Sequence, residues 1–286
     1  MPRIQTLLDW TVLIALLVAG FLVAWNAELP ANATRFTPPA VYARWWAMTE
    51  ACSGRSGNLA DIHWYRVPVS EFMYGGQRAG GYTSRWSNRI VLIQAIIERG
   101  EMVRHEMLHA LLRRGGHPRA QFLGSCASIV LCQGYCIKAA GPWHPPQTDY
   151  VVLPPNSLEV ASHAQLLPRE SDGQRWFEVE ITVKNPRGRA LVVAAPGDRV
   201  TPHTFGYTLR GPVTSWSPFR GGGIGGGEVM TDSSTVFFKP FETKKYLYEF
   251  LVADTLDEYH ISPGMYVVRG DYARHQAAND TVAVSP

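Results

Sequence analysis

Residues 105–109 read His-Glu-Met-Leu-His, a run whose residue types and spacing could do chemistry by themselves. On an α-helix, positions i and i+4 lie on the same face, so His105 and His109 can bind one metal ion together. Glu106 lies about 100° around the helix axis, where its carboxylate can reach a metal-bound water. Zn²⁺ lowers the pKa of such a water towards neutral. The motif therefore supplies two metal ligands and a general base.

The helix that must hold this motif is itself predicted by the sequence. Residues 94–114 fit a helical pattern, and Gly115-Gly116 is expected to end it. The buried stripe consists of Val103, Met107, Ala110 and Leu111. A chance match to the motif is expected on the order of 0.01 times in such a chain. The plainer alternative, two surface histidines beside a glutamate, would leave polar groups unpaired beside this stripe, so a metal site is favoured.

This motif and the apolar helix around it resemble the zincin metallopeptidases, with a looser likeness over residues 41–140. The resemblance implies one catalytic Zn²⁺, with His105 and His109 as ligands and Glu106 as catalytic base and acid. It also implies that residues 82–93 supply the strand bordering the cleft. A peptide or protein substrate would lie along that strand by β-addition.

The third ligand is less clearly marked. His109 is not followed by the x-x-Gly-x-x-His of the metzincins, but Gly116-His117-Pro118-x-x-x-Phe122 looks like the SprT and WLM type of zincin. That resemblance makes His117 the third ligand. The gluzincin alternative is a downstream carboxylate, Asp149 or Glu159, and His144 is a further candidate.

Three other features carry weaker signals. Tyr82 and Tyr135 could polarise a carbonyl, but packing roles are favoured for both. The glycine run 221–227 lacks the Lys-Ser/Thr of a phosphate-binding loop and is interpreted as a loop. The basic residues of the motif helix are assigned to its solvated face, with attraction of acidic substrates as the alternative: Arg104, Arg113 and Arg114.

The pattern predicts two folded regions. In the first, residues 41–140, we expect a helix over 41–49, strands over 62–67, 71–74, 82–85 and 90–93, the motif helix, and a further helix from Pro118 towards Cys126. The proline-rich stretch 141–156 is the expected linker. In the second region, residues 157–286, we expect a β-sandwich with strands over 176–184, 190–194, 205–209, 235–238, 245–252 and 265–271.

The second region is also similar to bacterial Ig-like sandwiches, of which the intracellular proteinase inhibitor type is an example. The likeness rests on Val179–Pro186, which ends in Asn-Pro, and on the Pro-Gly-x-Tyr of residues 263–266. The expected fold class is therefore an α+β zincin-like catalytic domain followed by an all-β Ig-like sandwich, preceded by one N-terminal hydrophobic helix.

The N-terminus and the cysteines both point outside the cytoplasm. Residues 10–27 carry no charge and are long enough for one membrane anchor, flanked by Trp10 and Trp25. A cleaved signal ending near Ala31-Asn32-Ala33 is the alternative, which would make the protein secreted. Residues 28–40 are then a proline-containing spacer. The four cysteines, Cys52, Cys126, Cys132 and Cys136, predict two disulfides of undetermined pairing, with Cys52 tying the start of the folded region to its middle.

Composition limits the function classes. The 286 residues are 46% hydrophobic and 18% charged, with a formal net charge of +3, which predicts an ordered core and no nucleic-acid partner. We expect an extracytoplasmic, membrane-anchored zinc metallopeptidase. The alternative is a non-catalytic zincin-like metal-binding scaffold whose sandwich binds a protein or peptide partner. An open coordination position at the metal would favour the enzyme, and a fourth protein ligand such as His144 or Cys126 would favour the scaffold.

Overall fold

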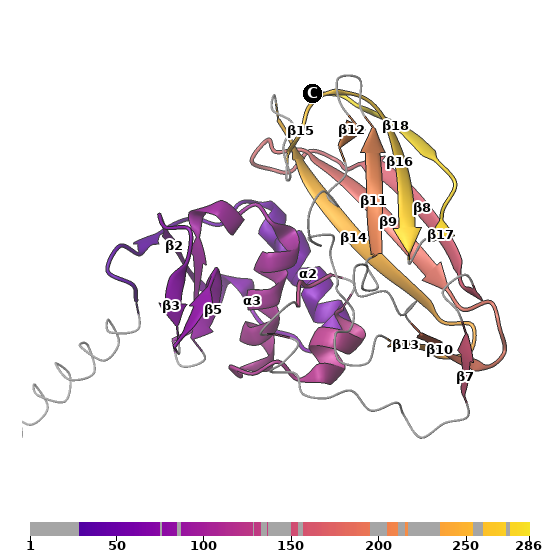
Figure 1. Ribbon diagram of the computed structural model, residues 1–286. Helices are drawn as coiled ribbons and strands as arrows, with labels where there is room; N and C mark the ends of the chain where they lie inside the picture. The colour runs from indigo at the N-terminus through magenta and orange to yellow at the C-terminus, as the bar shows by residue number, and fades with distance from the viewer. Residues whose placement is uncertain are drawn as a thin grey trace, which may run out of the picture.

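The computed structural model describes residues 29–286 except 75, 85–86, 128, 133–135, 137–149, 154–156, 195–204, 211–214, 217–234, 254–259 and 273–274. The fold is mixed α+β and mostly β, with the helices confined to the N-terminal half (Figure 1). Among the helices described, none is both long and apolar enough to cross a bilayer. The predicted anchor or signal segment, residues 1–27, lies outside the described residues.

A four-stranded sheet of order β1-β2-β6-β5 forms the base of the N-terminal half. Its strands are β1 (Thr34–Arg35), β2 (His63–Val67), β6 (Arg89–Ile93) and β5 (Gly81–Ser84). β2 and β6 are parallel, whereas β5 is antiparallel to β6 and lies at the edge. β6 is buried on both faces, because Ile90 and Leu92 pack towards the helices and Val91 packs on the opposite side.

Two helices cover one face of this sheet, α2 (Val41–Ser53) and α3 (Gly100–Leu112). α2 runs beyond the predicted 41–49 and ends where Gly54 adopts a left-handed conformation. α3 begins later than the predicted residue 94. The chain first forms a 3₁₀ turn, η2 (Gln94–Ile96), and Arg99 is extended, with φ −97° and ψ 94°. The helix expected after Pro118 is present as a short π-helical turn, η3 (Gln121–Ser125).

The second face of the sheet is covered by a smaller apolar cluster. Val67, Tyr82 and Val91 form its buried part. Phe72, from the hairpin β3 (Phe72–Tyr74) and β4 (Gln77–Ala79), packs against it, and so does Leu29. The predicted spacer of residues 28–40 is thus folded onto the domain where it is described, since β1 also pairs with β2.

The C-terminal half places two sheets face to face. One has the order β15-β14-β9-β8, and the other consists of β12-β11-β16-β17 with β18 paired to β16. Both contribute to one core through residues such as Phe177, Phe250 and Tyr266. The strand bounds are β8 (Glu159–Leu166), β9 (Trp176–Lys184), β11 (Phe205–Arg210), β12 (Ser215–Trp216), β14 (Thr243–Val252), β15 (His260–Ile261), β16 (Gly264–Tyr272), β17 (His275–Gln276) and β18 (Asp280–Val284).

A third, small sheet has the order β13-β10-β7. Its strands are β7 (Tyr150–Leu153), β10 (Ala190–Ala194) and β13 (Thr235–Phe238). β7 falls within the predicted linker of residues 141–156 and pairs in parallel with β10. Part of that linker is therefore a strand of the C-terminal half, and its residues 141–149 and 154–156 lie outside the described residues.

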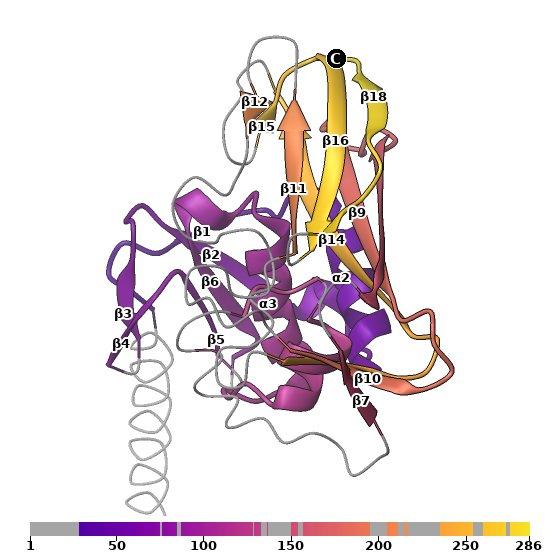
Figure 2. The same cartoon turned by 45° about the vertical axis from the view of Figure 1, so that its right-hand side comes forward.

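The two halves are joined by buried side-chain contacts rather than by the chain alone, and in Figure 2 the helices α2 and α3 lie beside β14. The Trp45 ring of α2 and the Trp176 ring of β9 meet edge to face, with centroids 5.2 Å apart. Glu249 of β14 forms ion pairs with Arg104 of α3 and with Arg44 of α2. Trp176 therefore belongs to the helix-side core even though β9 is a sandwich strand.

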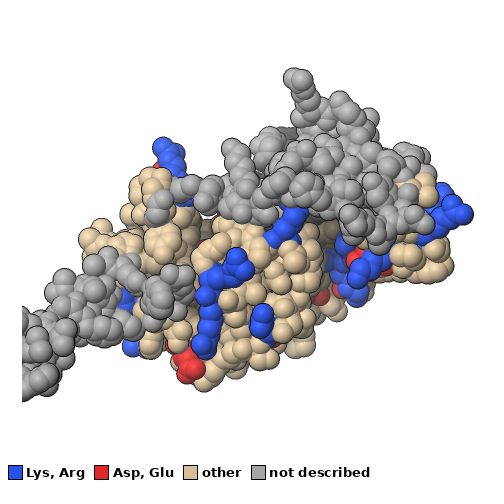
Figure 3. Space-filling model, turned by 90° about the horizontal axis from the view of Figure 1, so that it is seen from below, with Lys and Arg blue, Asp and Glu red and all other residues tan. Residues whose placement is uncertain are grey.

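The assignment of Arg104 to a solvated helix face is wrong. Its side chain is buried, and Glu249 is also buried. The reason is that β14 covers this side of α3, which no local pattern in the helix reveals. Arg113 and Arg114, which follow the last turn of α3, are exposed as predicted. On the face seen from below, Lys and Arg side chains are scattered among uncharged residues (Figure 3).

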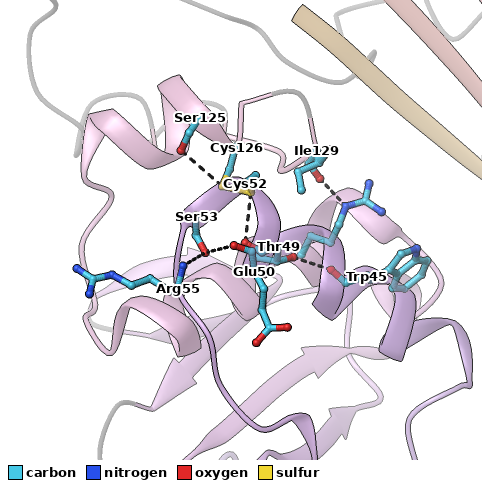
Figure 4. The surroundings of a disulfide bond; sticks show 10 residues. Trp45, Thr49, Glu50, Cys52, Ser53, Arg55, Ser125, Cys126 and Ile129 are labelled. Carbon is cyan, nitrogen blue, oxygen red and sulfur yellow. Dashed lines mark hydrogen bonds between the residues drawn. A yellow bond between two sulfur atoms is a disulfide. The ribbon is translucent and has the colours of Figure 1, made fainter.

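The two predicted disulfides are present. Cys52–Cys126 joins the C-terminal end of α2 to η3, as Figure 4 shows, and Cys132–Cys136 closes a short loop. The first bridge ties the start of the folded region to its middle across a separation of 74 residues, as expected. Two disulfides and no free cysteine indicate an oxidising, extracytoplasmic environment.

Candidate metal centre

Three histidines converge at one point beside α3. The Nε2 atom of His117 lies 3.2 Å from Nε2 of His109 and 3.2 Å from Nε2 of His105. His105 and His109 come from successive turns of α3, and His117 comes from the segment after it. The structure thus brings together the three predicted ligands, and they form a group that could hold a metal ion.

His117 reaches the other two because the chain turns sharply after α3. Arg113 adopts a left-handed conformation, with φ +50°, and its backbone N–H donates to the carbonyl of Ala110. The turn therefore begins at Arg113, two residues before the predicted Gly115-Gly116. The two glycines follow it, and a Cβ at either would meet nothing within 4 Å. His117 then lies opposite the face of α3 that carries His105 and His109.

Hydrogen bonds at the far nitrogens orient two of the rings. Nδ1 of His105 lies 2.6 Å from the carbonyl oxygen of Leu131, and Nδ1 of His109 lies 3.1 Å from that of Arg114. A carbonyl only accepts, so each Nδ1 carries the proton and each Nε2 presents a lone pair. Backbone carbonyls commonly orient metal-ligating histidines in this way.

The geometry fits a tetrahedral ion. Metal–nitrogen distances of about 2.0–2.1 Å at a tetrahedral centre place the ligand nitrogens about 3.3 Å apart, close to the 3.2 Å between these Nε2 atoms. Unprotonated nitrogens that converge in this way repel one another unless a cation lies between them. The donor set therefore suits Zn²⁺, which imidazole ligands bind well.

Phe122 forms the wall behind the three histidines. Its ring is fully buried, and its centroid lies 4.9 Å from the His105 ring, 4.8 Å from the His109 ring and 4.9 Å from the His117 ring. This residue is the Phe of the Gly-His-Pro-x-x-x-Phe pattern, and η3 presents it. The cluster therefore has an apolar wall on one side, and the cleft opens onto it as well.

Burial keeps the histidines neutral. It lowers the pKa of His109 and of His117 from 6.5 to about 4. It also lowers the pKa of His105 well below 6.5, helped by the positive charge that protonated His109 and His117 would carry. Neutral imidazoles are the form that binds metals, so these side chains are ready to bind an ion across the physiological pH range.

Glu106 is held in the wall of the cleft by β5. Its Oε2 atom lies 2.9 Å from Oγ1 of Thr83, and the same hydroxyl lies 2.8 Å from the Glu106 carbonyl oxygen. Burial raises the pKa of Glu106 to about 7, and the bond from Thr83 opposes part of this rise. A carboxyl with this pKa can take up and release a proton near neutral pH.

Gly81 makes room for that carboxyl. A Cβ at this position would lie 3.0 Å from both Cγ and Oε1 of Glu106 and 3.1 Å from Cδ2 of Leu92. The sequence analysis singled out neither Gly81 nor Thr83. The roles of Gly81 and Thr83 depend on β5 lying beside α3, a non-local contact that no motif in the sequence records.

A cleft of about 510 Å³ opens onto the histidines and Glu106. Its walls include Tyr74 and Arg78 of the β3–β4 hairpin, the edge strand β5, and Cys136. Tyr82 lines it too and is buried, with its ring stacked on that of Tyr74 at a centroid distance of 4.1 Å. Tyr82 thus has the packing role that the sequence favoured, at the rim of the site.

The alternative third ligands are not brought to this site where they are described. Glu159 lies on β8 of the sandwich, exposed, and pairs with Lys184 at 3.3 Å. His144, Asp149 and Tyr135 lie outside the described residues, as do residues 221–227. Cys126 is in a disulfide and has no thiolate to offer.

A chain of contacts links the sandwich to the first histidine. Glu249 pairs with Arg104, whose Nε donates to the carbonyl of Ile129 at 2.6 Å. Two residues on, the N–H of Leu131 donates to the carbonyl of Glu101 at 3.0 Å, and the Leu131 carbonyl accepts from His105. Gly100, at the start of α3, is needed for this packing, because a Cβ there would lie 2.7 Å from Nη1 of Arg104 and 2.8 Å from Oε2 of Glu249.

Comparisons with known proteins add little to this geometry. No protein-family model matches the chain, and no curated protein matches it. Among solved structures, it is similar to the X-ray structure of a Northeast Structural Genomics Consortium target, SoR45, at 15% sequence identity. That match covers 45% of this chain and 88% of the other, with a TM-score of 0.24, and at this value it carries no argument about fold or function.

Proposed function

We propose that the protein is a zinc-dependent peptidase in which His105, His109 and His117 hold one Zn²⁺ and Glu106 is the general base. The observation that carries the proposal is the convergence of three histidines beside a buried glutamate, with Nε2 of His117 3.2 Å from Nε2 of each of the other two. A structural site would need the histidines but not Glu106, whose pKa of about 7 suits proton transfer.

Each residue of the site has a definite task in peptide hydrolysis. When bound, Zn²⁺ polarises the peptide carbonyl and makes a water more acidic. Glu106 would take a proton from the water whose oxygen bonds to the carbonyl carbon, and would pass it to the amide nitrogen as the C–N bond breaks. Thr83 holds the carboxylate against β5, and Gly81 leaves it room to move. Phe122 keeps water away from the rear of the histidines.

The substrate would bind as an added strand. β5 is an edge strand that pairs, within the described residues, only with β6. Two of its residues, Gly81 and Thr83, adjoin the Glu106 carboxyl. A peptide aligned along β5 would form main-chain hydrogen bonds and pass directly over Glu106. We therefore propose extended peptide or protein segments as substrates.

The finer fold assignments belong to this proposal. Residues 41–140 would be a zincin-like domain nearest in layout to the SprT and WLM type, and residues 157–286 an Ig-like sandwich. The apolar run 10–27 would be a single membrane anchor that leaves both parts outside the cytoplasm, in keeping with the two disulfides.

The non-catalytic scaffold is the other candidate, and its test is whether a fourth protein ligand closes the site. Among the described residues, the group that could hold a metal contains three histidines and no fourth donor. Cys126, which could have served as that donor, is bonded to Cys52. Both observations favour an open position and hence the enzyme.

Metal content and hydrolysis test the proposal together. Elemental analysis of the full chain should find about one zinc per molecule, and His117→Ala should lose most of it. Glu106→Gln should keep the zinc and abolish cleavage of an extended-peptide library. Hydrolysis that persists in Glu106→Gln would overturn the assigned base, and full zinc retention in His117→Ala would overturn the ligand set.

A further inference from the structure

The point where the chain enters the domain lies beside the cleft. Leu29, the first described residue, packs against the cluster of Val67, Tyr82 and Val91. Tyr82 lines the cleft, and Phe72 of the adjoining hairpin packs on the same cluster. In both ribbon views the start of the described chain lies close to β3 and β4 (Figures 1 and 2). The uncharged run ends at residue 27, only two positions earlier.

The chain between Ala27 and Leu29 is too short to hold the domain far from the end of the uncharged run. An extended chain spans at most about 3.6 Å per residue, so Ala27 and Leu29 are no more than about 7 Å apart. That distance is comparable to the thickness of one headgroup layer, roughly 5–8 Å. If residues 10–27 cross a bilayer, the Leu29 cluster is held at its surface, and so is the hairpin packed on it.

The hairpin region has the surface that such a position requires. Five large hydrophobic side chains are exposed within the described residues, and three of them lie between positions 69 and 74: Val69, Met73 and Tyr74. Met73 is 66% exposed. Two exposed arginines, Arg66 and Arg78, flank this stretch, and Arg78 pairs with Glu71 at 3.4 Å. Apolar tips bordered by Tyr and Arg are typical of segments at a membrane interface.

From this we infer that the surface around Val69, Met73 and Tyr74 docks on the lipid bilayer that anchors the chain, so that the cleft opens at the membrane surface. We call this surface the hairpin tip. The inference rests on the proposed anchor and deepens the proposed peptidase function. Tyr74 and Arg78 belong to the hairpin and also line the cleft, so docking of the hairpin brings this wall of the cleft to the bilayer surface. The substrate class is therefore extended segments that adjoin a membrane.

Labelling from the lipid tests the docking without relying on hydrolysis. The full chain is placed in nanodiscs of phosphatidylcholine and phosphatidylglycerol that contain a lipid with a photoactivatable carbene near its headgroup. Trypsin cleaves after Arg66 and Arg78, so the hairpin tip is recovered as peptide 67–78. We expect this peptide to carry several-fold more label than peptide 246–269, which contains Met265.

The other two exposed large hydrophobics provide matched controls. Met265 is 57% exposed on β16, and Phe241 is 63% exposed before β14, both in the C-terminal half. Val69→Ser/Met73→Ser should reduce the labelling of peptide 67–78 several-fold, and Phe241→Ser/Met265→Ser should leave it unchanged. Peptide 67–78 labelled no more than 246–269 would overturn the inference. A chain whose intact mass shows removal of residues 1–27 would overturn it too.

A second arm distinguishes this inference from the peptidase proposal. One peptide is offered either tethered to the nanodisc lipid by a short spacer or free in solution. We expect the tethered form to be cleaved faster, and Val69→Ser/Met73→Ser to remove most of the difference while Phe241→Ser/Met265→Ser does not. Labelling without cleavage of either form would overturn the peptidase and leave the docking intact. Equal rates for both forms would overturn the substrate class.

Discussion

Arg104, the residue immediately before His105, is paired in the interior with Glu249, which lies 145 positions later on β14. Burial disfavours the charge on Glu249, but Arg104 and Arg44 outweigh this effect and keep the pKa of Glu249 below its usual value. The carboxylate therefore stays ionised and pairs with both arginines at the junction of the halves, where Arg44 also pairs with Glu170. β14, a strand of the C-terminal half, is thereby part of the support of α3, which carries His105 and His109.

Replacing that carboxylate tests the support. Glu249→Gln would leave the buried Arg104 without the carboxylate that pairs with it, which typically costs about 3–5 kcal/mol, whereas Arg44 would keep its ion pair with Glu170. Urea unfolding measures this loss of stability, and zinc titration should show weaker binding because Arg104 also holds the Ile129 carbonyl. The matched control is Glu180→Gln, whose partner Lys245 is exposed, and it should change stability by less than about 1 kcal/mol. Equal effects of the two substitutions would refute the role of Glu249.

Gly81→Ala should damage catalysis and spare the metal. The added methyl group would displace the Glu106 carboxyl from its place beside β5. We expect kcat to fall by about 10- to 100-fold, with about one zinc still bound. Gly80→Ala is the control, because its Cβ would make only ordinary contacts, the nearest at 3.6 Å. The rate of peptide hydrolysis and the zinc content are measured for both variants. An unchanged kcat in Gly81→Ala would contradict the packing argument.

The metal-free protein should lose stability as the pH falls from about 6.5 to about 4. In that range the unfolded histidines bind protons near their ordinary pKa, whereas folded His109 and His117 stay neutral down to about pH 4. The unfolded state then binds more protons, and stability declines with falling pH. Glu106 acts in the opposite sense between 4.5 and about 7, because its folded pKa is raised. Three histidines outweigh one glutamate.

Urea midpoints measured from pH 7.5 to 4.5 in the presence of a chelator check this slope. Glu106→Gln removes the opposing contribution, so its midpoint should fall more steeply than that of the wild type. A midpoint that rises as the solution is acidified would show that the histidines are not buried neutral in the absence of metal.

The two disulfides should differ in what they protect. Cys52–Cys126 spans 74 residues, so losing it should cost about 4 kcal/mol of stability. Cys132–Cys136 spans only 4 residues, and Cys132 directly follows Leu131, whose carbonyl orients His105. We expect Cys52→Ala/Cys126→Ala to lower the urea midpoint strongly, and Cys132→Ala/Cys136→Ala to affect zinc affinity more than stability. The reverse pattern would contradict these assignments.

Local patterns predicted most of the elements, and the three histidines expected to lie together do so. The helical spacing of His105 and His109 is set within about one turn of α3, and the resemblance of Gly116-His117-Pro118 to a known zincin pattern indicated His117, so no distant contact was needed. The residues that prepare Glu106 could not be predicted in the same way. Thr83 and Gly81 act on it only because β5 lies against α3. Arg104 was assigned to solvent because its partner is a strand of the other half.

Glu249, the partner of Arg104, is also synthesised late, because it lies in the C-terminal half. Synthesis and export proceed from the N-terminus, so α3 emerges long before β14. Until β14 has been synthesised, Arg104 lacks the carboxylate that pairs with it in the interior, and the helix carrying His105 and His109 lacks its cover. The cluster of three histidines is thus fully supported only late in biogenesis. The N-terminal half therefore cannot complete its own interior before most of the C-terminal half has been synthesised.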